Sequence, residues 1–145
     1  MNYNVRHLPA IGRLLTAAIF IVSGFGKIAA PAMTQGYIAS AALPVPTIAY
    51  LIAIVIEVSG GLFLVLGFRT RATAAVLAAF VAATALSFHH NFADQNQVIH
   101  FLKNIAITGG LLQVVAFGAG SFSFDNRRTS LDLPAPTHLS ERSSA

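Results

Sequence analysis

The chain has no cysteine and few charged residues for its length. Without cysteine it can form no disulfide, carry out no thiol redox chemistry and hold no cysteine-ligated cluster. Charged residues make up only 10% of the 145 residues, whereas a soluble domain typically carries about 25%. Hydrophobic residues reach 55%, so the chain lacks the polar surface that water requires. The composition favours a single-domain membrane protein, and any redox role would need an electron carrier other than a protein thiol.

The formal net charge of +4 does not come from a basic patch. Lysines and arginines stand singly or in pairs between long apolar stretches, unlike the clustered basic face of a nucleic-acid-binding domain. Basic residues placed in this way are typical of topology signals in a membrane protein. We therefore expect the lipid bilayer, and no nucleic acid, as a partner.

Long stretches without charge predict four membrane-spanning helices, because about 20 mostly apolar residues cross the hydrocarbon core. The uncharged stretches are residues 28–56, 72–88 and 104–124. With interior charges allowed, the predicted spans lie near 9–29, 47–67, 71–90 and 98–119. The predicted fold class is therefore all-α, an integral membrane four-helix bundle. The first outer loop carries no charge from Pro31 to Pro44, and it favours a short interfacial helix.

Positive charges are divided unevenly between the two sides of this bundle. Alternate crossings place seven arginines on one side: Arg6, Arg13, Arg69, Arg71, Arg127, Arg128 and Arg142. Lys27 and Lys103 fall toward the other side. The positive-inside rule then places the arginine side, with both termini, in the cytoplasm. Residues 1–124 form the predicted membrane domain, and residues 125–145 a cytoplasmic tail without a packed core.

The first span is the least apolar, because Arg13 and Lys27 stand near its two ends. It can still cross the bilayer if these side chains extend toward opposite interfaces. A cleaved secretory signal peptide is the alternative, with Ala30-Pro31-Ala32 resembling a cleavage site. Lys27 and Pro31 argue against cleavage, and an intact mass lacking about thirty residues would argue for it.

Glu57 is the most informative residue, since it stands alone near the middle of the second span. A charged side chain near the bilayer centre costs about 2.5 to 3.5 kcal/mol on insertion scales, so it must be paired, protonated or hydrated. Lys27 and Lys103 are the expected partners by depth, and Asn104 can accept from a lysine and donate to Glu57. With neighbours on the same helical faces, the candidate intramembrane polar site is Ser23, Lys27, Glu57, His100, Lys103 and Asn104.

This polar cluster has two interpretations. It can be a structural link between helices, because interhelical polar contacts contribute about 0.6 kcal/mol on average and fix the register. It can also line a site for a polar headgroup such as a quinone, or for a proton, because ionisable residues inside a membrane favour a function. A metal site is not expected, because the adjacent His89 and His90 cannot easily share one tetrahedral ion.

The chain resembles the DoxX family of small bacterial four-helix membrane proteins along nearly its whole length. The most specific part is Glu57 with Gly60 and Gly61, followed at the right distance by Lys103 and Asn104. Further matching positions are Arg13, Phe20, Ser23, Gly24, Lys27, Leu64, Leu66, Gly67, Thr70, Arg71, Ala106, Gly109, Gly110, Gly118, Gly120, Ser123 and Asp125. One departure is Phe124, which stands where the family's aromatic-Ser-Leu-Asp pattern has leucine.

The resemblance implies a multi-pass protein of the bacterial inner membrane, loosely associated with quinone-linked or oxidative-stress oxidoreductase complexes. Our first hypothesis is a quinone-interacting or accessory subunit of a membrane oxidoreductase, with quinone as the candidate cofactor. Its candidate partners are an oxidoreductase and further copies of the same chain. Whether the chain is itself an enzyme is left open. The alternative is a non-enzymatic scaffold or assembly factor, and a third hypothesis is a small transporter with Glu57 as the coupling carboxylate.

Overall fold

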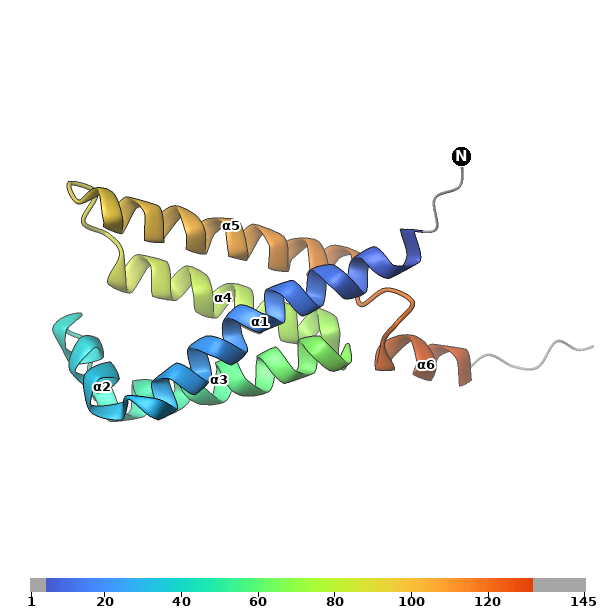
Figure 1. Cartoon of the computed structure of the whole chain (residues 1–145), viewed down its shortest axis with the longest axis horizontal. Coiled ribbons are helices and arrows are strands. Elements are labelled where there is room, and N and C mark those ends of the chain that lie inside the picture. Colours follow the sequence, from blue (N-terminus) through green and yellow to red (C-terminus); the bar gives the residue numbers. More distant parts are fainter. Residues whose placement is uncertain (1–4, 132–145) are drawn as a thin grey trace, which may run out of the picture.

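The computed structural model describes residues 5–131, with side chains as far as residue 127, and its regular elements there are all helical (Figure 1). The elements in chain order are η1 (Val5–His7), α1 (Leu8–Ala29), α2 (Pro31–Ser40), α3 (Pro46–Leu66), α4 (Thr70–Phe88), α5 (Gln95–Phe117) and α6 (Phe124–Leu131). The four long helices agree closely with the four predicted spans. The prediction of an all-α four-helix membrane protein is therefore confirmed.

Each long helix is long and apolar enough to cross a membrane, the first together with its short η1 extension. Large apolar side chains lie on the outside of these helices, for example Val22 at 73%, Val55 at 64% and Leu86 at 67% exposure. A soluble protein rarely exposes continuous apolar faces of this kind. Helices satisfy their backbone hydrogen bonds internally, so these faces are suited to lipid.

The bundle consists of two helix pairs. α1 packs along α3 and α4 packs along α5, while the pairs meet mainly through α3 and α4, and α1 barely touches α5. Leu64, Leu77 and Leu111 are fully buried and form the centre of the core. α1 approaches α3 closely because Gly61 has no side chain, and a Cβ there would lie 2.8 Å from Ile21 Cγ1.

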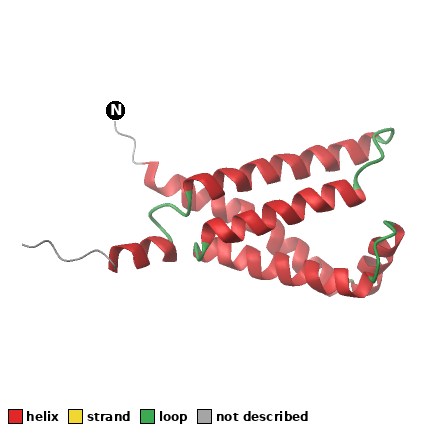
Figure 2. Cartoon of the chain, turned by 180° about the vertical axis from the view of Figure 1, so that it is seen from behind, coloured by secondary structure: helices red, strands yellow, loops and turns green. Residues whose placement is uncertain are grey.

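The two ends of the bundle carry different parts of the chain. Figure 1 places the start of α1, the turn from α3 to α4 and α6 at one end, which we call the terminal end. α2 and the connection from α4 to α5 lie at the opposite end, which we call the far end, and Figure 2 shows the same division from behind. Four crossings require this arrangement of the chain. That the terminal end faces the cytoplasm stays a prediction.

The expected short helix in the first outer loop is present as α2. It begins at Pro31, where proline lacks only an N–H that would be unpaired in any case. Ile38 is buried, and the ring of Tyr37 stacks on Phe88 with 5.1 Å between centroids. α2 therefore covers part of the far end, next to the polar residues described below.

Candidate functional site

A cavity of about 210 Å³ lies toward the far end, among all four long helices. We call it the far-end cavity. Its lining residues are Ile19, Phe20, Ser23, Lys27, Glu57, Phe80, Val81, Thr84, His89, Lys103, Asn104 and Ile107. Five of the six candidate site residues are among them. The sixth, His100, lies next to the cavity without lining it.

Glu57 is held by α1. Lys27 Nζ donates to both carboxylate oxygens, at 2.9 Å to Oε1 and 2.8 Å to Oε2. Ser23 Oγ donates to Oε1 at 3.2 Å and accepts from Lys27 Nζ at 2.8 Å. The Glu57 side chain is only 7% exposed, so this ion pair offsets the cost of a carboxylate at that depth. Tyr50 Oη, a contact that the sequence did not suggest, donates to the Lys27 carbonyl at 3.2 Å.

Lys103 does not pair with Glu57 as expected. Its Nζ lies 3.0 Å from His100 Nδ1 instead. The His100 ring stacks on His89 with 5.1 Å between centroids, and His89 Nδ1 lies 2.9 Å from Gln97 Oε1. The helical spacing of Lys103 and His100 favours this local contact, because residues three apart are neighbours on one face.

Asn104 lies in the cavity wall and does not bridge a lysine to Glu57. The residue is 9% exposed, and its side-chain amide makes no hydrogen bond with any residue that the structure describes. Among the described residues, the fully buried side-chain nitrogen and oxygen atoms without a hydrogen-bond partner are Arg13 Nε and Thr70 Oγ1. The Asn104 amide is not one of them, because it opens onto the cavity. The amide is therefore available to a group from outside the chain.

Together these side chains can bind an uncharged polar ring. The amide of Asn104 and the ammonium of Lys103 can donate to carbonyl oxygens, while the Glu57 carboxylate can accept from a hydroxyl. The rest of the wall consists of aliphatic and aromatic side chains, including Phe20 and Phe80, together with Thr84 and His89. Within the described part of the chain, no group of three or more His, Cys, Asp or Glu residues is placed to hold a metal ion.

A second cluster of buried polar residues lies at the terminal end, around Arg13. The guanidinium is 2% exposed and donates to two carbonyls, Leu64 O at 2.8 Å and Phe122 O at 2.6 Å. Arg13 therefore reaches the terminal end of the bundle, where protein carbonyls bind its guanidinium. That this end lies at a membrane interface stays a prediction. Gly67 is needed beside it, because its φ of 65° is left-handed and a Cβ there would collide with Arg13 Nη1.

Asp125 closes this cluster by capping α4. Its carboxylate oxygens accept from Arg69 N and Thr70 N, each at 2.8 Å, and its own N–H donates to Gly67 O at 3.0 Å. Burial opposes ionisation of the carboxyl, but the hydrogen bonds from Thr70 and Arg69, together with the charge of Arg13, hold its pKa below the ordinary value. The aspartate therefore stays ionised and fixes the start of α4.

The predicted tail begins differently from the expectation. Its first residue, Asp125, is tied to the bundle, and α6 extends from Phe124 to Leu131. The pattern Phe122-Ser123-Phe124-Asp125 marked the aspartate in the sequence. It did not indicate which residues the carboxylate would bond to. The rest of the predicted tail, with Arg142, lies outside the described residues.

Comparison with known proteins agrees with the family resemblance seen in the sequence. The family model described as DoxX matches residues 8–90. The Inner membrane protein YqjF of Escherichia coli K12 is 40% identical over 115 residues, which cover 79% of this chain and 87% of the relative. The Inner membrane protein YphA of the same organism is 36% identical over 125 residues, or 83% and 89% of the two chains. No solved structure matches at a comparable level of significance.

Proposed function

The chain belongs to the DoxX family of multi-pass inner-membrane proteins, and on this premise we propose that its far-end cavity binds the ring of a quinone in support of a membrane oxidoreductase. The observation that carries the proposal is Asn104, a residue of the cavity wall whose side-chain amide opens onto the cavity and is unused by the described residues. A ring with carbonyl or hydroxyl oxygens would satisfy it. The hydrocarbon of a lipid acyl chain would not.

The size of the cavity supports a single ring. A dry cavity of about 150 Å³ in another protein holds benzene, whereas one water in the liquid takes about 30 Å³. A space of about 210 Å³ therefore accommodates one substituted ring but no long isoprenoid tail. Ile19, which lines the cavity, is 40% exposed on the outer surface of α1. A tail would thus remain in the lipid while the ring occupies the cavity.

The charges around the cavity suit both redox forms of such a ring. Lys27 and Glu57 neutralise each other at 2.8 Å, which leaves the Lys103 ammonium, close to His100, as a donor for an oxygen of the ring. Asn104 and Lys103 can donate to the oxygens of a quinone, and Glu57 and Asn104 can accept from the hydroxyls of a hydroquinone. The chain has no thiol to pass electrons. We therefore assign it the role of an accessory subunit, with the electrons coming from a partner oxidoreductase.

The test is the quinone content of the full chain purified gently in native lipids. We expect near-stoichiometric quinone in the wild type and a loss of about tenfold in Asn104→Leu, since one lost hydrogen bond of about 1.4 kcal/mol corresponds to a factor of ten. Glu57→Gln should also lower the content. Gln113→Leu is the matched control, because it removes an exposed amide from the same helix outside the cavity.

Two results would count against the proposal. Background quinone in the wild type would overturn it and give first place to the scaffold or assembly-factor hypothesis. An equal loss in Gln113→Leu and Asn104→Leu would show that the quinone is carried by the surrounding lipid and not by the cavity.

A further inference from the structure

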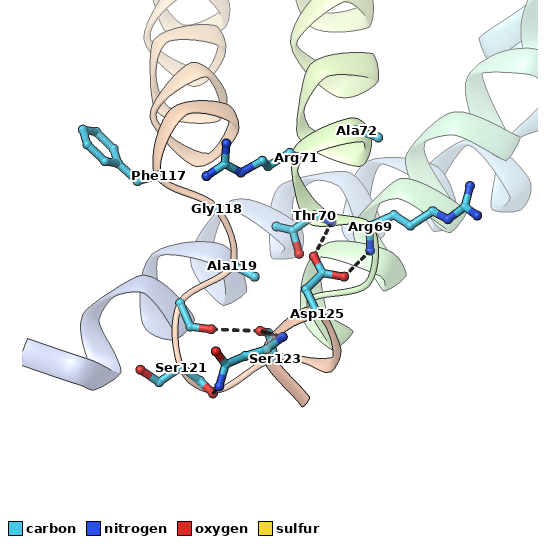
Figure 3. Close-up of a pocket in the computed structure, with 12 residues that line it drawn as sticks. Arg69, Thr70, Arg71, Ala72, Phe117, Gly118, Ala119, Ser121, Ser123 and Asp125 are labelled. Carbon is cyan, nitrogen blue, oxygen red and sulfur yellow. Dashed lines mark hydrogen bonds between the residues drawn. The ribbon is translucent and has the colours of Figure 1, made fainter. Parts of the chain in front are cut away.

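A larger and more open pocket of about 740 Å³ lies at the terminal end, between the start of α4 and the segment that follows α5 (Figure 3). We call it the terminal pocket. Its lining residues are Arg69, Thr70, Arg71, Ala72, Phe117, Gly118, Ala119, Gly120, Ser121, Ser123, Asp125 and Asn126. None of them belongs to the far-end cavity.

Arg71 places an unpaired guanidinium in this pocket. Its side chain is exposed and has no acceptor among the described residues. Figure 3 shows it reaching from α4 toward Phe117 and Gly118, while Arg69 extends away from them. Gly118 has a φ of 82°, and a Cβ there would lie 3.3 Å from Arg71 Nε. A glycine at this position therefore leaves the guanidinium free to face the opening.

Further donors line the same pocket. The backbone N–H groups of Ala119, Gly120 and Ser121 make no hydrogen bond with any residue that the structure describes. The one carboxylate in the lining, Asp125, accepts from the backbone of Arg69 and Thr70 and helps to close the turn. Arg71 thus has no counter-ion among residues 5–127, whose side chains the structure describes, and the pocket combines a planar cation with amide donors that these residues do not use. This combination suits a phosphate group, since the guanidinium matches phosphate geometry with two parallel hydrogen bonds.

The position of the pocket indicates where the phosphate comes from. α4 begins at Thr70 and α5 ends at Phe117, so the pocket lies where two membrane spans end, at the depth of lipid headgroups. Phe117 is 80% exposed beside it, and aromatic side chains are common at this depth. Basic pockets between membrane helices bind anionic headgroups.

We propose that the terminal pocket binds the phosphate of an anionic phospholipid, with Arg71 as the principal contact and the backbone of residues 119–121 as further donors. Phe117 then contacts the upper part of an acyl chain. This site is separate from the far-end cavity, so it does not depend on the quinone proposal.

The test titrates the detergent-solubilised full chain with phosphatidylglycerol and counts bound lipids by native mass spectrometry. Phosphatidylcholine with the same acyl chains is the uncharged comparison, and inorganic phosphate is added as a competitor. We expect the wild type to prefer phosphatidylglycerol and Arg71→Gln to bind it about tenfold more weakly. Arg6→Gln is the matched control, because Arg6 is exposed at the same end and does not line the pocket.

Three results would overturn the proposal. Equal binding of the two lipids by the wild type would remove the preference for an anionic headgroup. Equal weakening in Arg6→Gln and Arg71→Gln would show a diffuse charge effect. Displacement of the lipid by millimolar inorganic phosphate would show that the pocket binds free phosphate. The unfolding midpoint of each variant, measured in the same detergent, checks that the fold is retained.

Discussion

The two ends of the bundle both bury charged side chains, but they use them differently. At the terminal end the charges are bonded to backbone: Arg13 to the carbonyls of Leu64 and Phe122, and Asp125 to the amides of Arg69 and Thr70. At the far end Lys27, Ser23 and Glu57 bond to one another, and the amide of Asn104 is left unused by the described residues.

This difference in bonding partners indicates a structural role for the polar residues at the terminal end and a functional role for those at the far end. A buried charge that satisfies backbone groups joins segments distant in the sequence, and its loss leaves those groups unpaired. A buried polar group that borders a cavity and keeps free hydrogen-bonding capacity adds little to the fold. We therefore interpret the hydrogen bonds of Arg13 and Asp125 as a structural closure of the bundle, and we keep the far-end cavity as the proposed quinone site.

The largest effect on stability should come from Arg13→Leu. Two charge-assisted hydrogen bonds would be lost inside the bundle, and each contributes about 1.5–3 kcal/mol. We expect the free energy of unfolding to fall by about 3 kcal/mol, measured by denaturing-detergent titration and circular dichroism in mixed micelles. Arg6→Leu, which removes an exposed arginine at the same end, should change it by less than about 0.5 kcal/mol. Similar small losses in both variants would contradict the structural role of Arg13.

Asp125→Ala should have a smaller effect, because the aspartate acts as a helix cap supplied from a distant part of the chain. Loss of a cap typically costs about 0.5–2 kcal/mol, and we expect a value in that range at neutral pH. Ser121→Ala, at an exposed residue of the same segment, is the control. A loss below that of the control would mean that α4 starts equally well without the carboxylate.

The same aspartate predicts a direction of pH dependence. Its pKa in the folded protein lies below the ordinary value of 3.8, so the folded state binds fewer protons than the unfolded state in this range. The stabilisation is therefore complete above the ordinary pKa and is lost as the pH falls through the lower, folded value. Stability measured from neutral to acidic pH should decline less steeply in Asp125→Ala than in the wild type. Parallel curves would exclude Asp125 as the titrating group.

The ion pair at the far end should contribute less than the terminal cluster. In a double-mutant cycle of Lys27→Met and Glu57→Gln we expect a coupling energy of about 0.6 to 1.7 kcal/mol, the range found for polar contacts between membrane helices. Lys27 is 23% exposed, which weakens the pair by hydration. A coupling above the loss caused by Arg13→Leu would reverse the comparison and make the far end the main structural closure.

The sequence predicts the spans well because hydrophobic length and charge placement directly decide what crosses a bilayer. It also predicts which residues share the cavity, since Ser23, Lys27, Glu57, Lys103 and Asn104 all line it. The partner of Glu57 within the cavity was harder to predict. Depth allowed both Lys27 and Lys103 as partners of Glu57, and only the packing of α1 on α3 places Lys27 within 2.8 Å.

Arg13 shows a different limit of the sequence. An arginine near the end of a span is expected to extend toward the interface. Its burial at the terminal end could not be predicted, because it depends on two distant carbonyls that bind the guanidinium. One belongs to Leu64 and the other to Phe122, 51 and 109 residues away along the chain. The sequence cannot mark these two carbonyls as partners, because every residue has a backbone carbonyl. Backbone partners of this kind follow only from the assembled fold.

The smallest effect on stability should come from Asn104→Leu. This variant tests most directly whether the far end differs from the terminal end in its role. The Asn104 amide has no partner in the described chain, so its removal breaks no hydrogen bond of the fold, and the cavity leaves room for the larger leucine side chain. We expect the free energy of unfolding to change by less than about 0.5 kcal/mol, while the bound quinone falls about tenfold. Measured on the same preparation, a large loss of stability would show that Asn104 has a structural partner after all. Unchanged stability with lost quinone would mean that the far end has kept an unpaired amide for its ligand, in contrast to the terminal end, where Arg13 and Asp125 bond to the backbone.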